Sequence, residues 1–448
     1  MVSRIIKIIL VAIGAVACIS GGVLYAMFPK IIKAKIEEQL ILANGTTTYE
    51  NWKNIPIPMY VRFYIFNVTN PSDFMNNNAK PIVEEVGPYT FKINRKKEVI
   101  GRNEERDTVQ YNEVNTYIFQ PEISAGTQDE MVYVVNAPLQ GIAKIATKNI
   151  PPLIRPFFMP LLSSLLIHYK EYVIVKRKIR QLLFDGYEVR LLKDLNKSAS
   201  RFVKIPPLLP NNTFGLFYGK NATSGGTFTV FTGKSNSSRF TLIDTWNNKR
   251  FLPYWSSKYC NMINGTDGGQ FPPHTTKEEI LYVFSTDLCR SLNFEYEKEV
   301  NIKGIKTNRF TIPAQFYAAP VANPDNQCFC SNNQSCLNGG VIELTTCKRG
   351  APVVASAPHF YQASKQYLQN VIGLKPDKTL HQTFLDVEPM TGLVLNARKR
   401  IQLNIDVKRT PELESLQSIN DVLIPLAWLS EVSQFSLPAS IIIIFKQS

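Results

Sequence analysis

Residues Ile401 to Lys408 read IQLNIDVK and carry the clearest periodic signal in the chain. Four apolar residues, at positions 401, 403, 405 and 407, alternate with four polar ones. A period of two places alternate side chains on opposite faces, so this pattern predicts a β-strand with one buried and one solvent-exposed face. Strands of this kind are typical of antiparallel sheets, and the stretch therefore favours an antiparallel β architecture.

Further β-rich stretches extend this prediction along the chain, because Gly, Asn, Ser and Pro clusters separate them as turns would. They are Asp107 to Phe119, Met131 to Val135, Thr227 to Thr232, Phe240 to Trp246 and Asn293 to Ile302. No regular alternation of strands with long helices occurs. The sequence therefore argues against parallel α/β architectures such as the Rossmann fold and the TIM barrel.

One segment has a helical period instead. Between Pro160 and Phe184, apolar residues recur every three or four positions, which predicts an amphipathic helix. The β-branched run Val173 to Val175 is its weak point. His168 falls on the apolar stripe, so we expect a packed histidine rather than a ligand-binding one.

Half of the net charge of +14 gathers around this segment. Lys144 to Lys193 holds ten Lys or Arg residues against three Asp or Glu, a net charge of +7. One interpretation is an ordinary solvated surface. The other is an electrostatic capture surface for anionic ligands, with the field supplied by Lys170, Lys176, Arg177, Lys178 and Arg180.

The first part of the chain predicts a membrane anchor. The 21 residues from Ile8 to Phe28 carry no charged side chain, and such a helix is long enough to cross a hydrocarbon core of about 30 Å. A cleaved signal peptide is the alternative, but its apolar part is shorter, at about 7 to 15 residues. With a mean hydropathy of −0.09 over 448 residues, the chain is not a polytopic membrane protein.

Sequons and cysteines place the residues after the span outside the cytosol. Eight N-x-S/T glycosylation sequons follow it, at Asn44, Asn67, Asn196, Asn211, Asn221, Asn236, Asn264 and Asn333. Six of the seven cysteines cluster within 88 residues, an even number that favours disulfides. A zinc site is the alternative, but the spacing of Cys328, Cys330, Cys336 and Cys347 does not repeat the usual paired ligands. An extracytosolic location also argues against nucleic acid as the partner of the positive charge.

No catalytic motif emerges from the sequence. The four histidines are not spaced as a metal pair, and no nucleophile elbow, P-loop or G-x-G-x-x-G motif occurs. We therefore expect no catalytic residues, no metal and no cofactor, and a protein that is not an enzyme.

Several stretches, taken together and in order, resemble the class B scavenger receptor family, which includes the fatty-acid translocase, the high-density-lipoprotein receptor and the lysosomal integral membrane protein. They are NWKNIPIPMYVRFYIFNVTNP (51–71), EVGPYTF (85–91), INGTDGGQFPP (263–273), FSTDLCRS (284–291), NPDNQCFC (323–330), SAPHF (356–360), LDVEPMTGLVL (385–395) and IPLAWLSE (424–431). The resemblance covers nearly the whole chain.

This resemblance implies an α+β fold: a large antiparallel β-barrel ectodomain with an apolar tunnel and an apical helical bundle, on an N-terminal transmembrane helix. The expected parts are a cytoplasmic segment (1–7), the span (8–28), an ectodomain (29–431) with its helical region at about 138–193, and a C-terminal segment (432–448). Relatives end in a second transmembrane helix, whereas the apolar stretch Phe435 to Phe445 would cover only about 16 Å as a helix. We therefore expect no complete second span there.

The resemblance also implies site residues. The six cysteines would pair as Cys260 with Cys328, Cys289 with Cys347, and Cys330 with Cys336; sequence alone leaves 15 connectivities open. His168 and Lys170 would stand where the translocase has two lysines, beside the cluster Lys176, Arg177, Lys178 and Arg180. Because histidine gains its charge in the acidic range, His168 would make anion capture stronger at pH 5 to 6.

The function implied is a receptor at the plasma membrane that binds fatty acids, sterols, phospholipids, lipoproteins or modified anionic particles and passes lipid to the membrane. The alternative is a sorting receptor in endosomes or lysosomes that binds a protein cargo at the apex.

Overall fold

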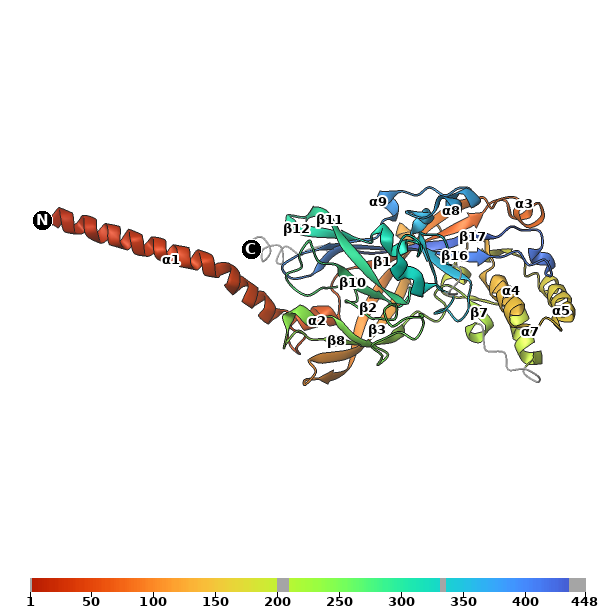
Figure 1. The fold of residues 1–448 in the computed structure, drawn as a ribbon, viewed down its shortest axis with the longest axis horizontal. Helices are drawn as coiled ribbons and strands as arrows, with labels where there is room; N and C mark the ends of the chain where they lie inside the picture. The colour runs from red at the N-terminus through yellow and green to blue at the C-terminus, as the bar shows by residue number, and fades with distance from the viewer. Residues whose placement is uncertain (1, 200–208, 331–335, 435–448) are drawn as a thin grey trace.

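The computed structural model describes residues 2–199, 209–330 and 336–434 (Figure 1). Helix α1 (Val2–Gln39) projects away from the rest of the chain. Its stretch Ala12–Gln39 contains an 18-residue window with a mean hydropathy of 1.7, is long and apolar enough to cross a membrane, and overlaps the predicted span at 8–28. Residues 12–31 are all exposed, so this part of the helix is not packed into the described protein, whereas its last turns reach the body, where Glu37 lies 3.2 Å from His274.

A 13-stranded sheet forms the body of the molecule, and every pair of its strands is antiparallel. The main path runs β10 (Leu281–Ser285), β11 (Arg290–Ile302), β12 (Ile305–Thr311), β15 (Phe384–Val387), β16 (Val394–Val407), β17 (Val422–Gln434), β1 (Met59–Val68), β2 (Val83–Asn103), β3 (Thr108–Phe119), β8 (Thr223–Phe231) and β9 (Ile243–Trp246). The short strands β13 (Val341–Glu343) and β14 (Val353–Ser356) join at β16. The antiparallel sheet expected from the sequence is confirmed, and each β-rich stretch named above overlaps a strand.

The two edges of this sheet come close to each other through one loop. The carbonyl of Gly265 accepts a hydrogen bond from the Ile243 N–H of β9, at 2.9 Å. The next residue, Thr266, donates to Tyr282 O and accepts from Phe284 N on β10, at 3.1 and 2.9 Å. Strand pairing alone leaves the sheet open, and this loop connects its first and last strands.

The apical helices, α4 (Ala137–Asn149), α5 (Arg155–His168), α6 (Ile179–Leu183) and α7 (Arg190–Ala199), occur together in the middle of the chain. Figure 1 shows α4, α5 and α7 at the end of the sheet opposite α1. Two small sheets, β4 (Met131–Val135) with β5 (Ile174–Lys178) and β6 (Tyr187–Glu188) with β7 (Thr213–Phe214), join them. Short helices elsewhere are α2 (Thr47–Lys53), α3 (Pro71–Asn76), α8 (Lys365–Asn370) and α9 (Lys378–His381).

The prediction of one amphipathic helix from Pro160 to Phe184 is wrong. Helix α5 ends at His168, and the β-branched run beginning at Val173 enters strand β5, which pairs with β4. Stiff β-branched side chains fit a strand better than a helix, and pairing with β4 decides the outcome. His168 is exposed rather than packed, so the expected apolar stripe does not form one buried face.

The strand predicted for Ile401 to Lys408 is confirmed as part of β16, but its solvent-exposed face is wrong at Gln402 and Asn404, while Asp406 is half-buried and Lys408 exposed. Gln402 and Asn404 are fully buried. Gln402 accepts a hydrogen bond from His359 N at 2.7 Å, and Asn404 donates to Ser356 Oγ at 3.0 Å. The segment around β14 and His359 covers this face, so its polar groups are satisfied by protein rather than by water.

A histidine pair continues this buried network. His359 Nε2 lies 2.6 Å from a Glu85 carboxylate oxygen that also accepts from Trp428 Nε1 at 2.6 Å. The ring of His381 stacks on that of His359 with centroids 4.5 Å apart. Burial, helped by the neighbouring His359, lowers the pKa of His381 to about 4.

A substitution at Gly265 tests whether this loop links the two edges of the sheet. Its φ is +85°, and a Cβ there would lie 1.8 Å from the carbonyl oxygen of Tyr282. Gly45 has φ +82° with nothing within 4 Å, and it too is the middle residue of an Asn-Gly-Thr sequon. We expect Gly45→Ala to cost about 1 to 2 kcal/mol from backbone conformation alone. Gly265→Ala should cost clearly more, measured as a larger fall in Tm, and equal effects would contradict the role of this loop.

His381 predicts a pH dependence of stability. An unfolded histidine binds a proton below about pH 6.5, whereas folded His381 does so only below about pH 4. The unfolded state therefore binds more protons between these values, and stability falls as pH falls through that window. When the pH is lowered from 7 to 4.5, the Tm of the His381→Gln variant should fall by less than that of the unmodified chain. The exposed His168→Gln serves as the control, and identical profiles for His381→Gln and the unmodified chain would refute the prediction.

Candidate functional site

The inner side of the large sheet borders a cavity of about 1630 Å³. This volume exceeds the roughly 300–1,000 Å³ of ordinary small-molecule pockets. At one end its wall includes Phe28 and Ile32 of α1 and Trp52 of α2, and at the other Tyr117 and Phe217. Most of the surface of the wall is apolar, so the cavity suits a ligand with a large apolar part.

An aromatic cluster, consisting of Phe63, Phe91, Tyr117, Phe184 and Phe217, lies between this cavity and the apical helices. Phe184 directly follows α6, and its ring centroid lies 5.1 Å from that of Tyr117 and 5.4 Å from that of Phe217. The Phe63 and Phe217 rings meet edge to face at 5.0 Å. Since Tyr117 and Phe217 also line the cavity, the cluster covers its apical end.

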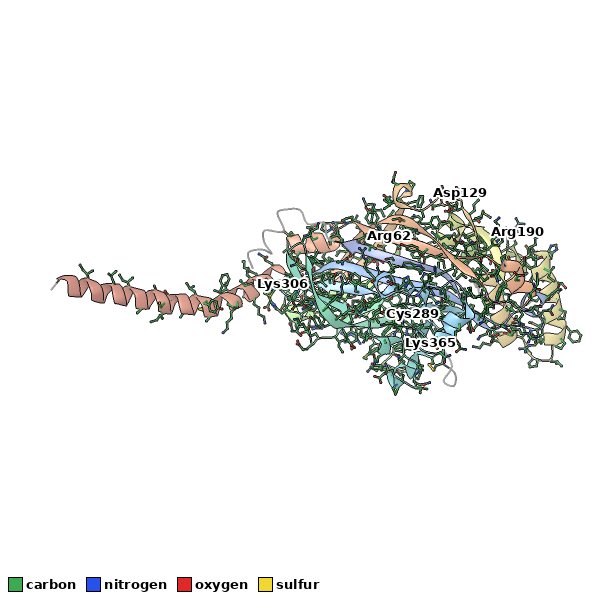
Figure 2. The ribbon with its side chains drawn as sticks, turned by 90° about the horizontal axis from the view of Figure 1, so that it is seen from above. Arg62, Asp129, Arg190, Cys289, Lys306 and Lys365 are labelled. Atoms are coloured by element: carbon green, nitrogen blue, oxygen red, sulfur yellow. A yellow bond between two sulfur atoms is a disulfide. The ribbon has the colours of Figure 1, made fainter. Side chains whose placement is uncertain are left out.

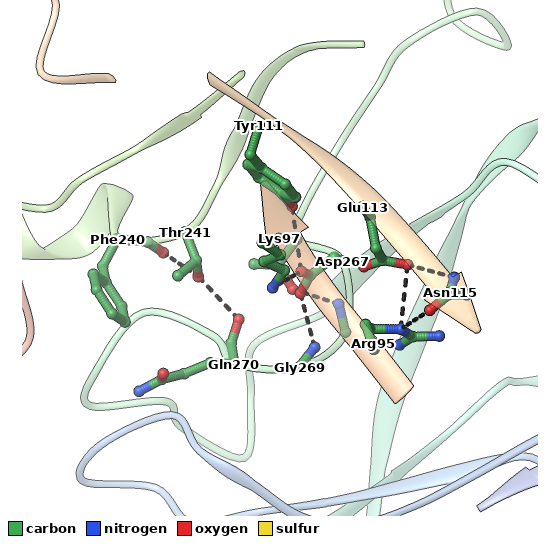
Figure 3. Close-up of polar contacts among 12 residues, drawn as sticks. Arg95, Lys97, Tyr111, Glu113, Asn115, Phe240, Thr241, Asp267, Gly269 and Gln270 are labelled. Carbon is green, nitrogen blue, oxygen red and sulfur yellow. Dashed lines mark hydrogen bonds and ion pairs between the residues drawn. The ribbon is translucent and has the colours of Figure 1, made fainter. Parts of the chain in front are cut away.

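The cavity wall also carries paired charges, which the expected apolar tunnel did not include. Lys97 Nζ lies 2.6 Å from an Asp267 carboxylate oxygen (Figure 3). It also sits over the rings of Trp52 and Tyr111, 5.0 and 5.4 Å from their centroids. Burial alone would raise the pKa of Asp267, but Lys97 and the Gly269 N–H lower it instead. This carboxylate therefore stays ionised inside the protein.

A second group of charges crosses three strands. Arg95 of β2 lies 3.2 Å from a carboxylate oxygen of Glu113 on β3 and 2.8 Å from one of Glu431 on β17. Burial would lower the pKa of Arg95, but the two carboxylates raise it. Figure 3 shows Arg95 and Glu113 beside the Lys97–Asp267 pair.

A third group, which we call the lysine cluster, comprises Lys220, Lys348 and Lys399 around Asp287. Asp287 lies 3.0 Å from Lys399 Nζ and 3.6 Å from Lys220 Nζ. The Lys399 ammonium is the main cause that lowers the pKa of Asp287 well below its usual range. All four residues line the cavity.

Sequence reasoning missed these charges, although a signal for them exists. On a strand, residues two apart share a face. Lys399 is in phase with Ile401, and Arg95 and Lys97 are in phase with Ile93, so each places a charge on an otherwise apolar face. A charge in that position indicates either that the interior beside it is hollow or that the charge has an ion-pair partner there.

The basic residues predicted at the apex have three different kinds of surroundings. Lys178 and Arg180 both pair with Asp129, at 3.0 and 2.9 Å, which compensates part of their charge. Lys170 and Lys176 are exposed and have no ion pair among the described residues. The guanidinium of Arg177 lies over the Tyr187 ring, 4.4 Å from its centroid.

The sequence analysis also missed an exposed apolar surface on α5. Phe157 is 80% and Leu161 59% exposed, and Leu153 just before the helix is 85% exposed. His168 lies two turns after Leu161, on the same side of the helix. The apex therefore presents apolar, basic and histidine side chains together.

The three disulfides join Cys260 with Cys328, Cys289 with Cys347, and Cys330 with Cys336, the pairs that the resemblance implies. Their cysteines are consequently not free to bind zinc. Among the sequons, Asn44, Asn211, Asn221 and Asn236 are exposed, and Asn67 and Asn264 are half-buried. Asn333, the side chain of Asn196 and the segment 435–448 lie outside what the structure describes.

Comparison with known proteins agrees with this architecture. The model of the CD36 family matches residues 12–448. The chain is 34% identical over 406 residues to "Lysosome membrane protein 2" of Rattus norvegicus, covering 90% of this chain and 81% of that protein. It is 34% identical over 421 residues to "Scavenger receptor class B member 1" of the same organism, covering 94% and 79%. The chain therefore belongs to the CD36 family, the class B scavenger receptors, which are receptors rather than enzymes.

Proposed function

We propose that this protein is a non-enzymatic receptor that binds lipids or lipoproteins at its apical helices and passes lipid through the cavity to the membrane. The cavity carries this proposal, because its wall reaches from the aromatic cluster beneath the helices to the apolar helix α1. In this proposal the sheet acts as a closed barrel, with the loop at Gly265 completing it, and the cavity acts as a tunnel.

The physical benefit of such a path is large. Moving a 16-carbon chain through water costs up to about 12 kcal/mol, at about 0.8 kcal/mol per methylene group. A continuous, mostly apolar wall removes most of this cost without any bond being made or broken. A receptor of this kind needs no nucleophile and no cofactor.

The apical surface supports capture of particles with mixed surfaces. Lys170 and Lys176 supply positive charge, and Phe157 and Leu161 supply exposed apolar area. Lipoproteins and modified lipid particles expose both anionic and apolar groups, so they match this combination. Fatty acids, sterols and phospholipids are the cargo classes that we propose, with the ectodomain extracellular at the plasma membrane.

A sorting receptor for a protein cargo in endosomes or lysosomes is the second candidate. The exposed His168 favours it, because this histidine lies beside the apolar side chains of α5 and its protonation would change the charge of that surface. Binding of a protein at this surface would need no passage through the cavity.

The apical lysines provide the first test. We expect Lys170→Glu with Lys176→Glu to weaken binding to vesicles containing anionic phospholipid by about tenfold at low salt, with less effect at high salt. The matched control is Lys306→Glu with Lys365→Glu, which changes net charge equally at exposed sites away from the apex (Figure 2). Equal weakening by the two double variants would contradict capture at the apex.

Blocking the cavity provides the second test. Ala397 of β16 lines the cavity, and Ala397→Trp would fill part of it. We expect transfer of fluorescent lipid from bound particles into the membrane to fall towards background, while particle binding at the apex stays unchanged. Ile100→Trp places the same side chain at an exposed position of β2 outside the cavity wall and serves as the control. Unimpaired transfer by a folded Ala397→Trp variant would contradict a route through the cavity.

A further inference from the structure

We propose that the lysine cluster is an anion-binding site inside the cavity, where Lys348, with Lys220 and Lys399, holds the carboxylate of a long-chain fatty acid whose tail lies along the apolar wall. This inference rests on the proposed lipid passage and adds to it a binding site and a chemical class of ligand.

Four separate segments bring these charges together. Lys399 comes from β16, and Asp287 from the turn between β10 and β11. Lys220 precedes β8, and Lys348 lies between β13 and β14. All four line the same cavity. Charged side chains from distant parts of a chain rarely converge on an interior surface unless they pair with one another or bind a ligand.

The charges of this region do not balance. Around the lysine cluster, four cations, Arg95, Lys220, Lys348 and Lys399, face three anions, Glu113, Asp287 and Glu431. Elsewhere on the cavity wall, Lys35 pairs with Glu38, and Glu388 accepts hydrogen bonds from Met390 and Thr391 of its own turn. The neighbouring Lys97–Asp267 pair adds no net charge. One positive charge therefore remains without a partner, and a single negative charge on a ligand would complete the group.

Lys348 carries that excess charge. Within the residues that the structure describes, its ammonium has no hydrogen bond or ion pair, whereas Lys220 and Lys399 both contact Asp287. Burial, together with the nearby Lys220 and Lys399, lowers the pKa of Lys348. A bound carboxylate would favour the charged ammonium and remove this imbalance.

The site is held in place before any ligand binds. The Cys289–Cys347 disulfide joins the turn that carries Asp287 to the segment that carries Lys348, which is adjacent to Cys347. Lys220 Nζ lies 5.0 Å from the ring centroid of Phe217 in the aromatic cluster. A fixed site loses little conformational freedom on binding.

The surroundings favour a carboxylate with an apolar tail over a small free anion. A phosphate monoester carries a charge of about −1.5 to −2, more than the single uncompensated cation requires. Beyond the lysine cluster the wall includes apolar Phe284, Leu292 and Leu385, which a small anion would leave in contact with water. A fatty acid satisfies both parts of the wall at once.

Binding of oleate and of its neutral analogue oleyl alcohol tests the site. The full chain in phosphatidylcholine nanodiscs is titrated with each ligand by calorimetry, and empty nanodiscs provide the background. We expect oleate to bind at least tenfold more tightly than oleyl alcohol. Lys348→Met should remove most of that difference, Lys348→Arg should keep it, and Lys306→Met, at an exposed site, should have no effect.

The outcomes separate the site from the wider proposal. If Lys348→Met weakens the binding of both ligands equally, or of neither, the headgroup site is refuted while lipid binding in the cavity stands. If neither ligand binds the unmodified chain, the cavity is not a lipid site and the proposed function fails with it. Competition of millimolar acetate or inorganic phosphate with oleate would indicate a small-anion site and overturn the assignment to a fatty acid. The Tm of Lys348→Met should equal or exceed that of the unmodified chain, because the variant removes a half-buried charge that has no ion pair among the described residues.

Discussion

The ion pairs on the inner face of the sheet are the interaction on which the rest of this structure depends. Arg95, held between Glu113 and Glu431, joins strands β2, β3 and β17 across the interior. Inward-facing charges cannot be packed against a dry apolar core, because a buried charge requires a partner or a polar surrounding. The interior of the sheet is therefore not filled by packed apolar side chains. The cavity follows from the need of these charges for partners.

The two ends of the cavity differ in what they contact. At one end the wall merges with α1, whose exposed apolar stretch is long enough to cross a membrane. At the other end the aromatic cluster separates the cavity from the apical helices. Its rings contact one another without hydrogen bonds. In the proposed passage, a rearrangement of Phe184 or Phe217 would open a route between apex and cavity. In the proposed function, capture, passage and delivery would therefore occupy successive levels of one ectodomain.

Local periodicity predicted much of this fold. The strand at Ile401 to Lys408 was identified from its alternation alone. Its polar residues Gln402 and Asn404 are nevertheless buried, because His359 and Ser356 come from a segment that local sequence does not place there. The helix predicted from Pro160 to Phe184 failed for the same reason, since pairing of β5 with β4 overrides a helical pattern. Tertiary contacts decided both outcomes.

The candidate site was less predictable than the fold. The apical basic residues were identified from charge density, but their division into paired and unpaired members depends on Asp129, which is about fifty residues away in sequence. The cavity charges were missed because Lys399 stands between Arg398 and Arg400 in the sequence, and only the strand period distinguishes its direction. The disulfide pairs came from the family resemblance alone, since the spacing of the cysteines leaves their connectivity open.

The most direct test of the central claim is the mass of lipid that remains bound to the purified protein. Lipids extracted from the full chain after detergent purification would be quantified by mass spectrometry beside those from the Ala397→Trp variant and from a mock purification. Enriched long-chain lipid in the unmodified chain, strongly reduced in the variant, is the result that a lipid-carrying cavity predicts. Equal lipid in all three samples would contradict it.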